Sequence, residues 1–458
     1  MQKSQEQSNN SVKIPLNPPF TKGESLGFLP LERGDWMRTS ATSKRDLKNS
    51  NRTIGTPRTL EQFRVALVHD FLIYPGGAEK VLEVLCEMFP EAPIYTLLYD
   101  SEKMRGKFKN REIRNSFLQK FPKFLRKRYR LLLPLMPTAP ETFDLRDFDL
   151  VISSSGAWSK GIITRLNTVH IAYIHSPMRF VWDYHEQYIR EVKSLKLKVQ
   201  SFFIRFFGRL FLSYLRLWDY EAAQRPDYLV ANSCYTQERI KKYYRRDSEV
   251  IYPPASNSLL PSGEGAHRAD EGALQKEPSL PSSLPKGERG NGRYFLSVSR
   301  LSPYKKVDIV IEAFNKLELP LVIIGEGKKI KYYRKIAGKN VKILGWQSEE
   351  KLGEYYKNAR AFIFPTEDDF GLTMVEAMNY GVPVIAYNGG GAKEIVEEGM
   401  TGEFFDAQTV EVLADGVRKF MENEEKYDKD YIIKRAGEFG KARFKLEFMN
   451  YIESIINS

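Results

Sequence analysis

Two carboxylates, Asp368 and Glu376, are separated by seven residues that include a Phe-Gly pair. They follow an apolar run that ends at Pro365, which is typical of a buried parallel strand. Leu372, Glu376 and Tyr380 are spaced four residues apart, so a helix would place all three on one face. A carboxylate on a largely apolar face needs partners, because burying it unpaired is costly. Ribose hydroxyl groups are suitable donors, and a capping backbone amide is the alternative partner.

A pair of cations, Arg300 and Lys305, lies just beyond a second apolar run. Positive charges past the end of a strand can neutralise a diphosphate, and the alternative is a solvent-facing pair. A third apolar run ends in a turn at Gly325 and Glu326. This turn is not a complete G-x-G-x-x-G motif, and no acidic residue stands where a nicotinamide-binding fold would hold its ribose.

Further candidates stand earlier in the chain. Gly76 and Gly77 lead into an amphipathic helical pattern, where exposed amides and the helix dipole favour phosphate. A plain strand–helix turn is the alternative for this glycine pair. His175 follows an apolar run and should project from the carboxyl end of a strand, where open parallel sheets bind ligands. A core histidine is the usual alternative, but Arg179 and Asp183 close by favour a role in a site.

Short apolar runs alternate with helical patterns in two parts of the chain, which predicts βαβ units and an α/β fold with two parallel sheets. Polar segments rich in Ser, Pro and Gly precede the first part and separate the two, and we expect both segments to be disordered. The predicted organisation is a disordered tail at 1–62, a first Rossmann-like domain at 63–254, a disordered insert at 255–292, a second Rossmann-like domain at 293–429 and a helix packing across both at 430–458.

Composition narrows the class of protein. The 458-residue chain is 42% hydrophobic and carries a net charge of +12, with a pI near 9.3. This positive charge suits an anionic ligand or membrane surface, and charge alone does not exclude nucleic acid. Cys86 and Cys234 lie in apolar patterns and predict buried thiols in a reducing compartment. The sequence contains no evident Cys/His metal cluster, membrane-spanning run or secretory leader, so we expect a cytoplasmic protein without a metal.

Two basic stretches interrupt the first half, at residues 103–130 and 190–218. In both, Lys and Arg are interleaved with Phe, Leu and Tyr. Apolar residues beside cations at helical spacing favour a helix that lies on an anionic bilayer. An ordinary helix with a solvated basic face is the alternative. We therefore expect a peripheral protein on the inner face of the cytoplasmic membrane.

Several motifs occur in a characteristic order: PGGAEKVLEVL, IHSPMRFVWD, ANSCYTQERI, SVSRLSPYKKVDIVIEAFN, ILGWQSEEKL, PTEDDFGLTMVEAMNYGVPVIAYNGGGAKEIV and EEGMTGEFF. Together they resemble the family 4 retaining glycosyltransferases of the GT-B fold, from about Arg64 to the C-terminus apart from the insert. The resemblance implies two Rossmann-like domains facing across a cleft, the first for the acceptor and the second for a nucleotide-sugar donor. The version IHSPMRFVWD is most similar to bacterial mannosyltransferases of surface-polysaccharide and O-antigen assembly, which points to GDP-mannose.

The resemblance also implies roles for individual residues. Arg300 and Lys305 match the pair that binds the donor pyrophosphate, and Glu376 matches the carboxylate that holds the ribose. Asp368 stands where the family usually has a Glu that contacts the donor sugar, and His175 matches a residue near the sugar hydroxyls. The implied catalytic set is His175, Asp368, Arg300 and Lys305. The implied donor-binding set is Gly76, Gly77, Arg300, Lys305, Gly325, Glu326, Asp368, Phe370, Gly371, Leu372, Thr373 and Glu376.

The family retains anomeric configuration and needs no metal, so the resemblance implies a hexosyltransferase without a cofactor. The implied partners are a nucleotide-sugar donor and a glycan or lipid-linked saccharide acceptor, whose identity and binding residues the sequence does not reveal. Three alternatives remain: an epimerase, phosphorylase or UDP-sugar-using enzyme on the same scaffold, a catalytically silent nucleotide-sugar-binding protein, and a nucleic-acid binder. The last is disfavoured because the sequence lacks an aromatic-basic sheet motif and a recognition helix.

Overall fold

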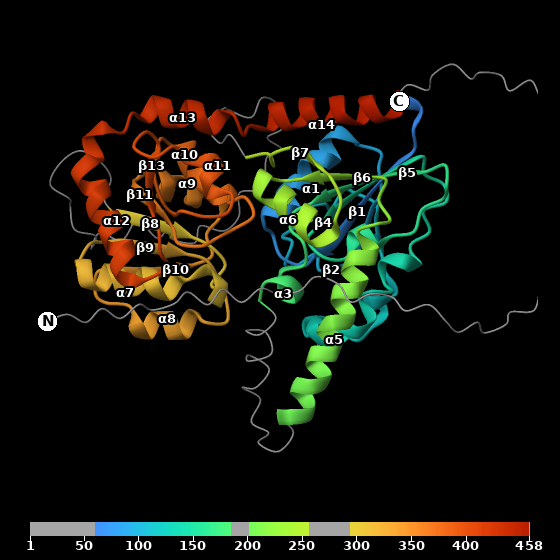
Figure 1. Cartoon of the computed structure of the whole chain (residues 1–458), viewed down its shortest axis with the longest axis horizontal. Helices are drawn as coiled ribbons and strands as arrows, with labels where there is room; N and C mark the ends of the chain where they lie inside the picture. The colour runs from blue at the N-terminus through green and yellow to red at the C-terminus, as the bar shows by residue number, and fades with distance from the viewer. Residues whose placement is uncertain (1–59, 185–200, 256–293, 458) are drawn as a thin grey trace, which may run out of the picture. The chain divides into compact units, whose positions relative to one another are not determined.

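The computed structural model describes residues 60–184, 201–255 and 294–457. Within these residues lie two parallel sheets with helices packed against them (Figure 1), which confirms the predicted pair of Rossmann-like halves. The predicted disordered tail and insert lie outside the described residues, except for Ala255 and a single 3-10 turn at Leu60–Gln62. The boundaries of the predicted domains stay a prediction.

The first sheet has seven strands in the order β3-β2-β1-β4-β5-β6-β7, and all its pairings are parallel. Its central strands are short runs of Val, Ile, Leu and Ala that are buried because helices cover both faces. The chain order reverses between β1 and β4, so a ligand crevice is expected at their carboxyl ends. The strands are β1 (Val65–Leu72), β2 (Ile94–Tyr99), β3 (Ile113–Asn115), β4 (Leu150–Ser155), β5 (Val169–Ile174), β6 (Tyr228–Ala231) and β7 (Glu249–Val250).

The helices of the first half are α1 (Gly77–Met88), α2 (Lys123–Lys127), α3 (Arg179–Trp182), α5 (Ser201–Ala222) and α6 (Cys234–Tyr244). The basic stretch at 103–130 was expected to be helical, and this is wrong for most of it. Turns and β3 occupy its first part, and its second part holds the short α2 between two 3-10 helices, Phe117–Lys120 and Tyr129–Leu135. Arg105, Gly106 and Phe108 all have positive φ, and Pro122 precedes α2, so a continuous helix cannot form.

The second sheet has six parallel strands in the order β10-β9-β8-β11-β12-β13. Neighbouring residues of one strand face opposite sides: Phe295 packs with α7 and α12, whereas Leu296 packs with α10. The strands are β8 (Tyr294–Val298), β9 (Leu321–Ile324), β10 (Val341–Gly345), β11 (Ala359–Phe364), β12 (Val384–Tyr387) and β13 (Gly402–Phe405). The helices are α7 (Val307–Leu317), α8 (Ile330–Ile336), α9 (Glu349–Lys357), α10 (Leu372–Met378), α11 (Ala392–Ile395) and α12 (Val410–Asn423).

Two C-terminal helices, α13 (Lys429–Gly437) and α14 (Lys441–Ile456), follow the second sheet and are drawn in red in Figure 1. Ile432 of α13 belongs to the apolar core of the second half. Phe444 and Phe448 of α14 are fully buried in the core of the first half, beside α1. The segment that follows the second sheet therefore contributes to both cores, and it does so through two helices instead of the single helix expected from the sequence.

The two cysteines differ in their surroundings. Cys86 is buried on α1, and this burial raises the pKa of its thiol to about 12. Cys234 is exposed, so the prediction of two buried thiols is wrong for this residue. It is the first residue of α6, and the outer side of a first helical turn meets solvent unless another element covers it.

Candidate functional site

The carboxyl ends of β8 and β11 meet where the order of the second sheet reverses, and both are followed by residues singled out in the sequence. Arg300 and Lys305 follow β8, and Asp368 follows β11. The Lys305 ammonium group contacts Oδ2 of Asp368. The fold therefore brings together a cation and a carboxylate that lie 63 residues apart in the chain.

Positive charge accumulates beside this pair. Arg300 is an exposed residue, and its guanidinium group donates a hydrogen bond to the Tyr304 hydroxyl oxygen at 3.0 Å. Burial alone would raise the pKa of the Tyr304 phenol, but the charges of Lys305 and Arg300 lower it below its ordinary value. A depressed phenol pKa marks a region that stabilises negative charge, which is what a diphosphate requires.

Glu376 lies on α10 and is 8% exposed. Its Oε1 contacts the Lys80 ammonium group, and its Oε2 accepts a hydrogen bond from the Tyr356 hydroxyl at 3.1 Å. The expectation that this carboxylate must have partners is met by side chains, and in the described part of the chain no backbone amide donates to it. Burial lowers the pKa of Lys80, but the adjacent Glu376 more than offsets this, so the group is charged.

The N-terminus of α1 meets the N-terminus of α10. A Cβ atom added to Gly77, the first residue of α1, would lie 3.1 Å from Cδ1 of Leu372, the first residue of α10, so the two helix starts are in close contact. Gly371 has φ +103°, a conformation that favours glycine, and it starts the helix that carries Glu376. Phe370 is buried against Tyr252, and Thr373 lies in the first turn of α10.

His175 follows β5 and lies in a chain of polar contacts. Its Nε2 is 2.7 Å from Oγ of Ser154, and the same Oγ is 3.1 Å from Nδ1 of His69. Nε2 of His69 is in turn 3.6 Å from Glu79. Burial, together with the neighbouring His69, lowers the pKa of His175 to about 3. The imidazole is therefore neutral at physiological pH and acts as a hydrogen-bonding group rather than a cation.

Two predicted donor-binding residues, Gly325 and Glu326, stand at the carboxyl end of β9, next to β8. A Cβ atom at Gly325 would come within 1.8 Å of the Ser299 carbonyl oxygen, so packing against the β8 loop already explains this glycine. Glu326 is exposed, and its backbone oxygen accepts a hydrogen bond from the Leu301 amide at 2.8 Å. Gly76 is exposed at the N-cap of α1.

Sequence reasoning named Arg179 only as a neighbour of His175, and it missed Lys80 and Arg239 as residues that connect the two halves at the site. Lys80, Arg179 and Arg239 come from the first half and contact carboxylates of the second half. The only local signal was that Lys80 and Arg179 stand inside the PGGAEK and IHSPMR motifs. Their partners lie well over a hundred residues away in the chain, and no periodic pattern connects positions so distant.

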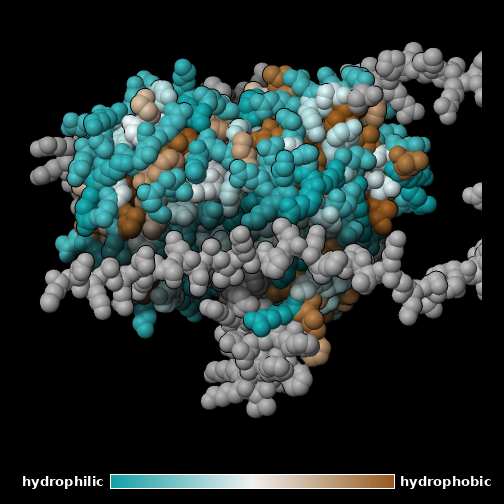
Figure 2. Space-filling model, in the orientation of Figure 1, coloured by the Kyte–Doolittle hydropathy of each residue, from teal (hydrophilic) through white to brown (hydrophobic). Residues whose placement is uncertain are grey.

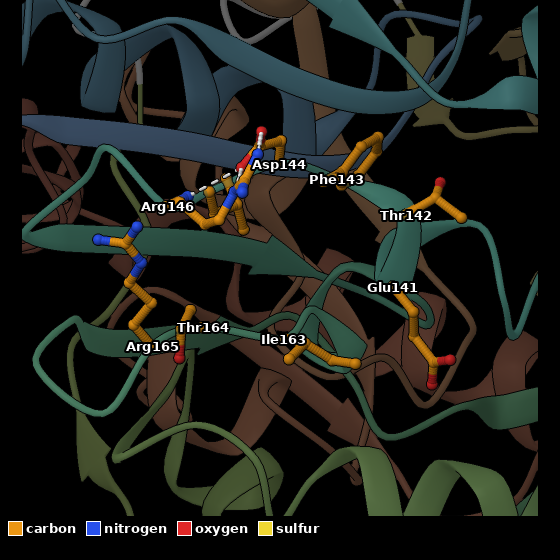
Figure 3. A pocket seen from close by; sticks show the side chains of 9 residues that line it. Glu141, Thr142, Phe143, Asp144, Arg146, Ile163, Thr164 and Arg165 are labelled. Carbon is orange, nitrogen blue, oxygen red and sulfur yellow. Dashed lines mark hydrogen bonds and ion pairs between the residues drawn. The ribbon is translucent and has the colours of Figure 1, made fainter.

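A groove of about 390 Å³ lies elsewhere on the first half (Figure 3). Its lining includes Asp144, Arg146, Ile163 and Arg165, and the Asp144–Arg146 ion pair is drawn with dashed lines. These residues precede β4 and β5, at the amino ends of the strands. The groove is therefore at the opposite edge of the sheet from His175, away from the edge where parallel sheets bind ligands.

Within the described residues, no group of three or more His, Cys, Asp or Glu side chains is arranged to hold a metal ion. Among the helices of the same residues, none combines the length and apolar character needed to cross a bilayer.

Two family models match the chain in succession. One described as Glycosyltransferase Family 4 matches residues 75–256, and one described as Glycosyl transferases group 1 matches residues 283–436. An uncharacterized glycosyltransferase of Methanocaldococcus jannaschii is 22% identical over 381 residues, covering 80% of this chain and 89% of the relative. A GDP-mannose-dependent alpha-(1-6)-phosphatidylinositol monomannoside mannosyltransferase of Mycobacterium tuberculosis is 28% identical over 208 residues, covering 41% of this chain and 51% of the relative.

Among solved structures, Anabaena Alr3699/HepE in complex with UDP-glucose matches with a TM-score of 0.59 at 18% sequence identity. The match covers 85% of this chain and 99% of that protein. At this identity the likeness concerns the fold, and it confirms the predicted GT-B arrangement of two parallel α/β sheets.

Proposed function

Because this chain is a family 4 glycosyltransferase that depends on a nucleotide sugar, we propose that it transfers mannose from GDP-mannose, with retention of configuration, to a glycan or lipid-linked saccharide. The observation that carries this proposal is the convergence of Arg300 and Lys305 with Asp368, opposite the glycine turn of the first half. The products would be the extended acceptor and GDP.

The chemistry follows from the charges at the site. Cleavage of the bond between sugar and phosphate leaves negative charge on the diphosphate. Lys305 and Arg300 stabilise this charge as it develops, and such preorganised electrostatic stabilisation is commonly worth about 3–4 kcal/mol per group. The start of α1 at Gly77 lies against Leu372, the first residue of α10, and the amide groups of a helix N-terminus add partial positive charge. The acceptor hydroxyl then attacks an oxocarbenium-like sugar from the face that the diphosphate leaves.

Two observations support mannose as the sugar. The IHSPMRFVWD segment has the form found in polysaccharide mannosyltransferases, and its Arg179 reaches the acidic loop of the donor half. The relative from Mycobacterium tuberculosis is named as GDP-mannose-dependent. A UDP-sugar-using enzyme is the alternative on the same scaffold.

A panel of nucleotide sugars tests the donor assignment by thermal stabilisation. A ligand at 100 times its Kd stabilises a protein by about 2.7 kcal/mol, so a true donor raises the Tm measurably. We expect GDP-mannose to give the largest rise. A larger shift with a UDP-sugar would contradict the guanine and mannose assignment, and no shift with any nucleotide sugar would contradict donor binding altogether. Tight binding without release of GDP in the presence of acceptor lipid extract would instead favour a silent binding protein.

We also propose that the first half rests on an anionic membrane surface. Phe207, Leu210, Tyr214 and Leu217 of α5 are each more than 50% exposed, at spacings that place them along one side of the helix. Apolar side chains are visible on this part of the molecule in Figure 2. Phe124 of α2 is 65% exposed, and α2 and its flanking residues carry several Lys and Arg. An apolar side flanked by cations is typical of helices that lie in an anionic interface.

Sedimentation with vesicles tests this surface. We expect the protein to bind phosphatidylglycerol vesicles and to bind phosphatidylcholine vesicles weakly, because each basic residue near an anionic surface contributes about 1 kcal/mol. Replacing Phe207, Leu210 and Leu217 together by Ser should reduce binding to the anionic vesicles at least tenfold. Leu446→Ser is the matched control, since Leu446 is 63% exposed on α14. Equal binding of the triple variant and the control would contradict the proposed surface.

A further inference from the structure

Asp368 meets a cation on each of its carboxylate oxygens. Lys305 of its own half contacts Oδ2, and Nη1 of Arg179 lies 3.3 Å from Oδ1. Burial would raise the pKa of Asp368, but these two cations more than offset this and hold it below its ordinary value. The carboxylate is therefore ionised, and its orientation is fixed by contacts from both halves of the protein.

Arg179 is itself held on the acidic loop by several contacts. Its Nε donates to Oδ2 of Asp369 at 2.8 Å, its Nη2 lies 2.6 Å from the same oxygen, and its Nη1 donates to the Glu367 carbonyl oxygen at 3.3 Å. A planar guanidinium group suits this task because its N–H groups point in fixed directions and can bridge neighbouring acceptors. One side chain of the first half thus contacts three consecutive residues of the second.

Asp369 is held by a second arginine. Its Oδ1 contacts Arg239, whose side chain is 7% exposed and also contacts Asp183 and Oγ of Ser176, the latter at 3.0 Å. The backbone oxygen of Asp369 accepts a hydrogen bond from the Ser233 hydroxyl at 2.6 Å. With its side chain only 10% exposed, Asp369 is a buried attachment point for the first half.

The short side chain of Asp368 explains why such support matters. An Asp places its carboxylate one methylene group nearer the backbone than the Glu usual at this position, so a sugar hydroxyl can reach it only in a narrow range of orientations. Each carboxylate oxygen has two lone pairs, and the cations on Oδ1 and Oδ2 leave the remaining ones for sugar hydroxyls. Arg179 holds Oδ1 while Lys305 contacts only Oδ2. Without Arg179, the carboxylate could turn so that both oxygens approach Lys305, and that ammonium group would be less available to the diphosphate.

We propose that Arg179 is a positioning residue, which fixes Asp368 against the donor sugar when the two halves are in contact and leaves Lys305 available to the phosphates. This inference rests on the proposed function, because it assigns the donor sugar to the space beside Asp368. Arg179 acts through Asp368 and does not itself contact the reacting atoms.

The test compares Arg179→Ala and Arg179→Lys with the wild-type protein in donor turnover and in GDP affinity. We expect Arg179→Ala to lower kcat for the donor at least thirtyfold, since misplacing a group by about 1 Å can cost 10²-fold. Arg179→Lys keeps the charge but cannot bridge the loop, so we expect about a tenfold loss. GDP affinity should stay within twofold in both variants, because Arg179 faces the sugar side rather than the nucleotide.

Tyr235→Phe is the matched control. The Tyr235 hydroxyl donates to Oε1 of Glu367 at 2.9 Å, so this variant removes a contact between the same halves, one residue away from Asp368. We expect its kcat to stay within threefold of wild type.

Two results would overturn the proposal. The first is an Arg179→Ala variant that keeps kcat within threefold of wild type. The second is a folded Arg179→Lys variant in which kcat and GDP affinity fall together, because that is the result expected if Arg179 has a purely structural role. A wild-type protein that turns over no nucleotide sugar would instead contradict the proposed function.

Discussion

Lys305→Ala is expected to lower donor turnover at least a hundredfold while leaving the fold intact. Lys305 is the cation that the structure holds against Asp368 and that also lowers the pKa of the Tyr304 phenol. Its removal leaves the charge of the departing diphosphate to Arg300 and the first-half amides. A hundredfold loss corresponds to about 2.7 kcal/mol of transition-state stabilisation, which is within the range for one preorganised charged group.

The measurement is steady-state release of GDP from the donor, with circular dichroism to show that the variant is folded. Lys306→Ala is the matched control, because Lys306 is the adjacent lysine and forms no ion pair with the described part of the chain. We expect this control to keep turnover within threefold. If the two variants behave alike, Lys305 is not the pyrophosphate ligand.

Glu376→Ala is the second variant expected to lose at least a hundredfold in donor turnover. The carboxylate is buried and is oriented by Lys80 and Tyr356, so its lone pairs face a fixed direction. In the proposed function, losing it removes the acceptor for the ribose hydroxyls. It also leaves the half-buried Lys80 ammonium group without this partner, and a charge that loses its partner away from solvent is costly. The effect should therefore appear as weaker nucleotide binding as well as lower turnover.

Calorimetric titration with GDP separates this effect from a loss of catalysis alone. Glu376→Gln keeps an oxygen that can accept from Tyr356 but lacks the negative charge, so its GDP affinity should lie between those of wild type and Glu376→Ala. Glu411→Ala, on the exposed side of α12, is the control and should match wild type. Near-wild-type activity in both Lys305→Ala and Glu376→Ala would remove the site assignment.

The fold class could be predicted from the amino-acid pattern alone, because local periodicity decides which segments become strands and helices. Apolar runs such as that before Pro365 became β11, and the spacing of Leu372 and Glu376 correctly indicated a helix that carries a carboxylate. The helix α10 ends at Met378, so Tyr380 lies in the turn that follows it and not on the helix face. Positions after strand ends were informative as well. In a parallel sheet they gather at one edge, so Arg300 and Asp368 could be expected to lie close together.

Local patterns failed where the surroundings or the turns decided the outcome. The apolar residues around Cys234 suggested burial, yet nothing in its own segment shows which side of the first turn of α6 faces solvent. The basic stretch at 103–130 had the composition of an amphipathic helix. Its positive-φ residues Arg105 and Phe108 break it into turns, a conformation that composition does not encode.

The contacts between the two halves at the site became known only from the folded chain. Lys80 and Glu376 are 296 residues apart in the chain, and Arg179 and Asp369 are 190 residues apart. Helix and strand periods relate residues only a few positions from one another, so they carry no information about such pairs. The sequence shows which residues are charged, including those that contact Glu376, Asp368 and Asp369. It does not show which of them form pairs, because the pairing depends on the packing of one complete sheet domain against the other.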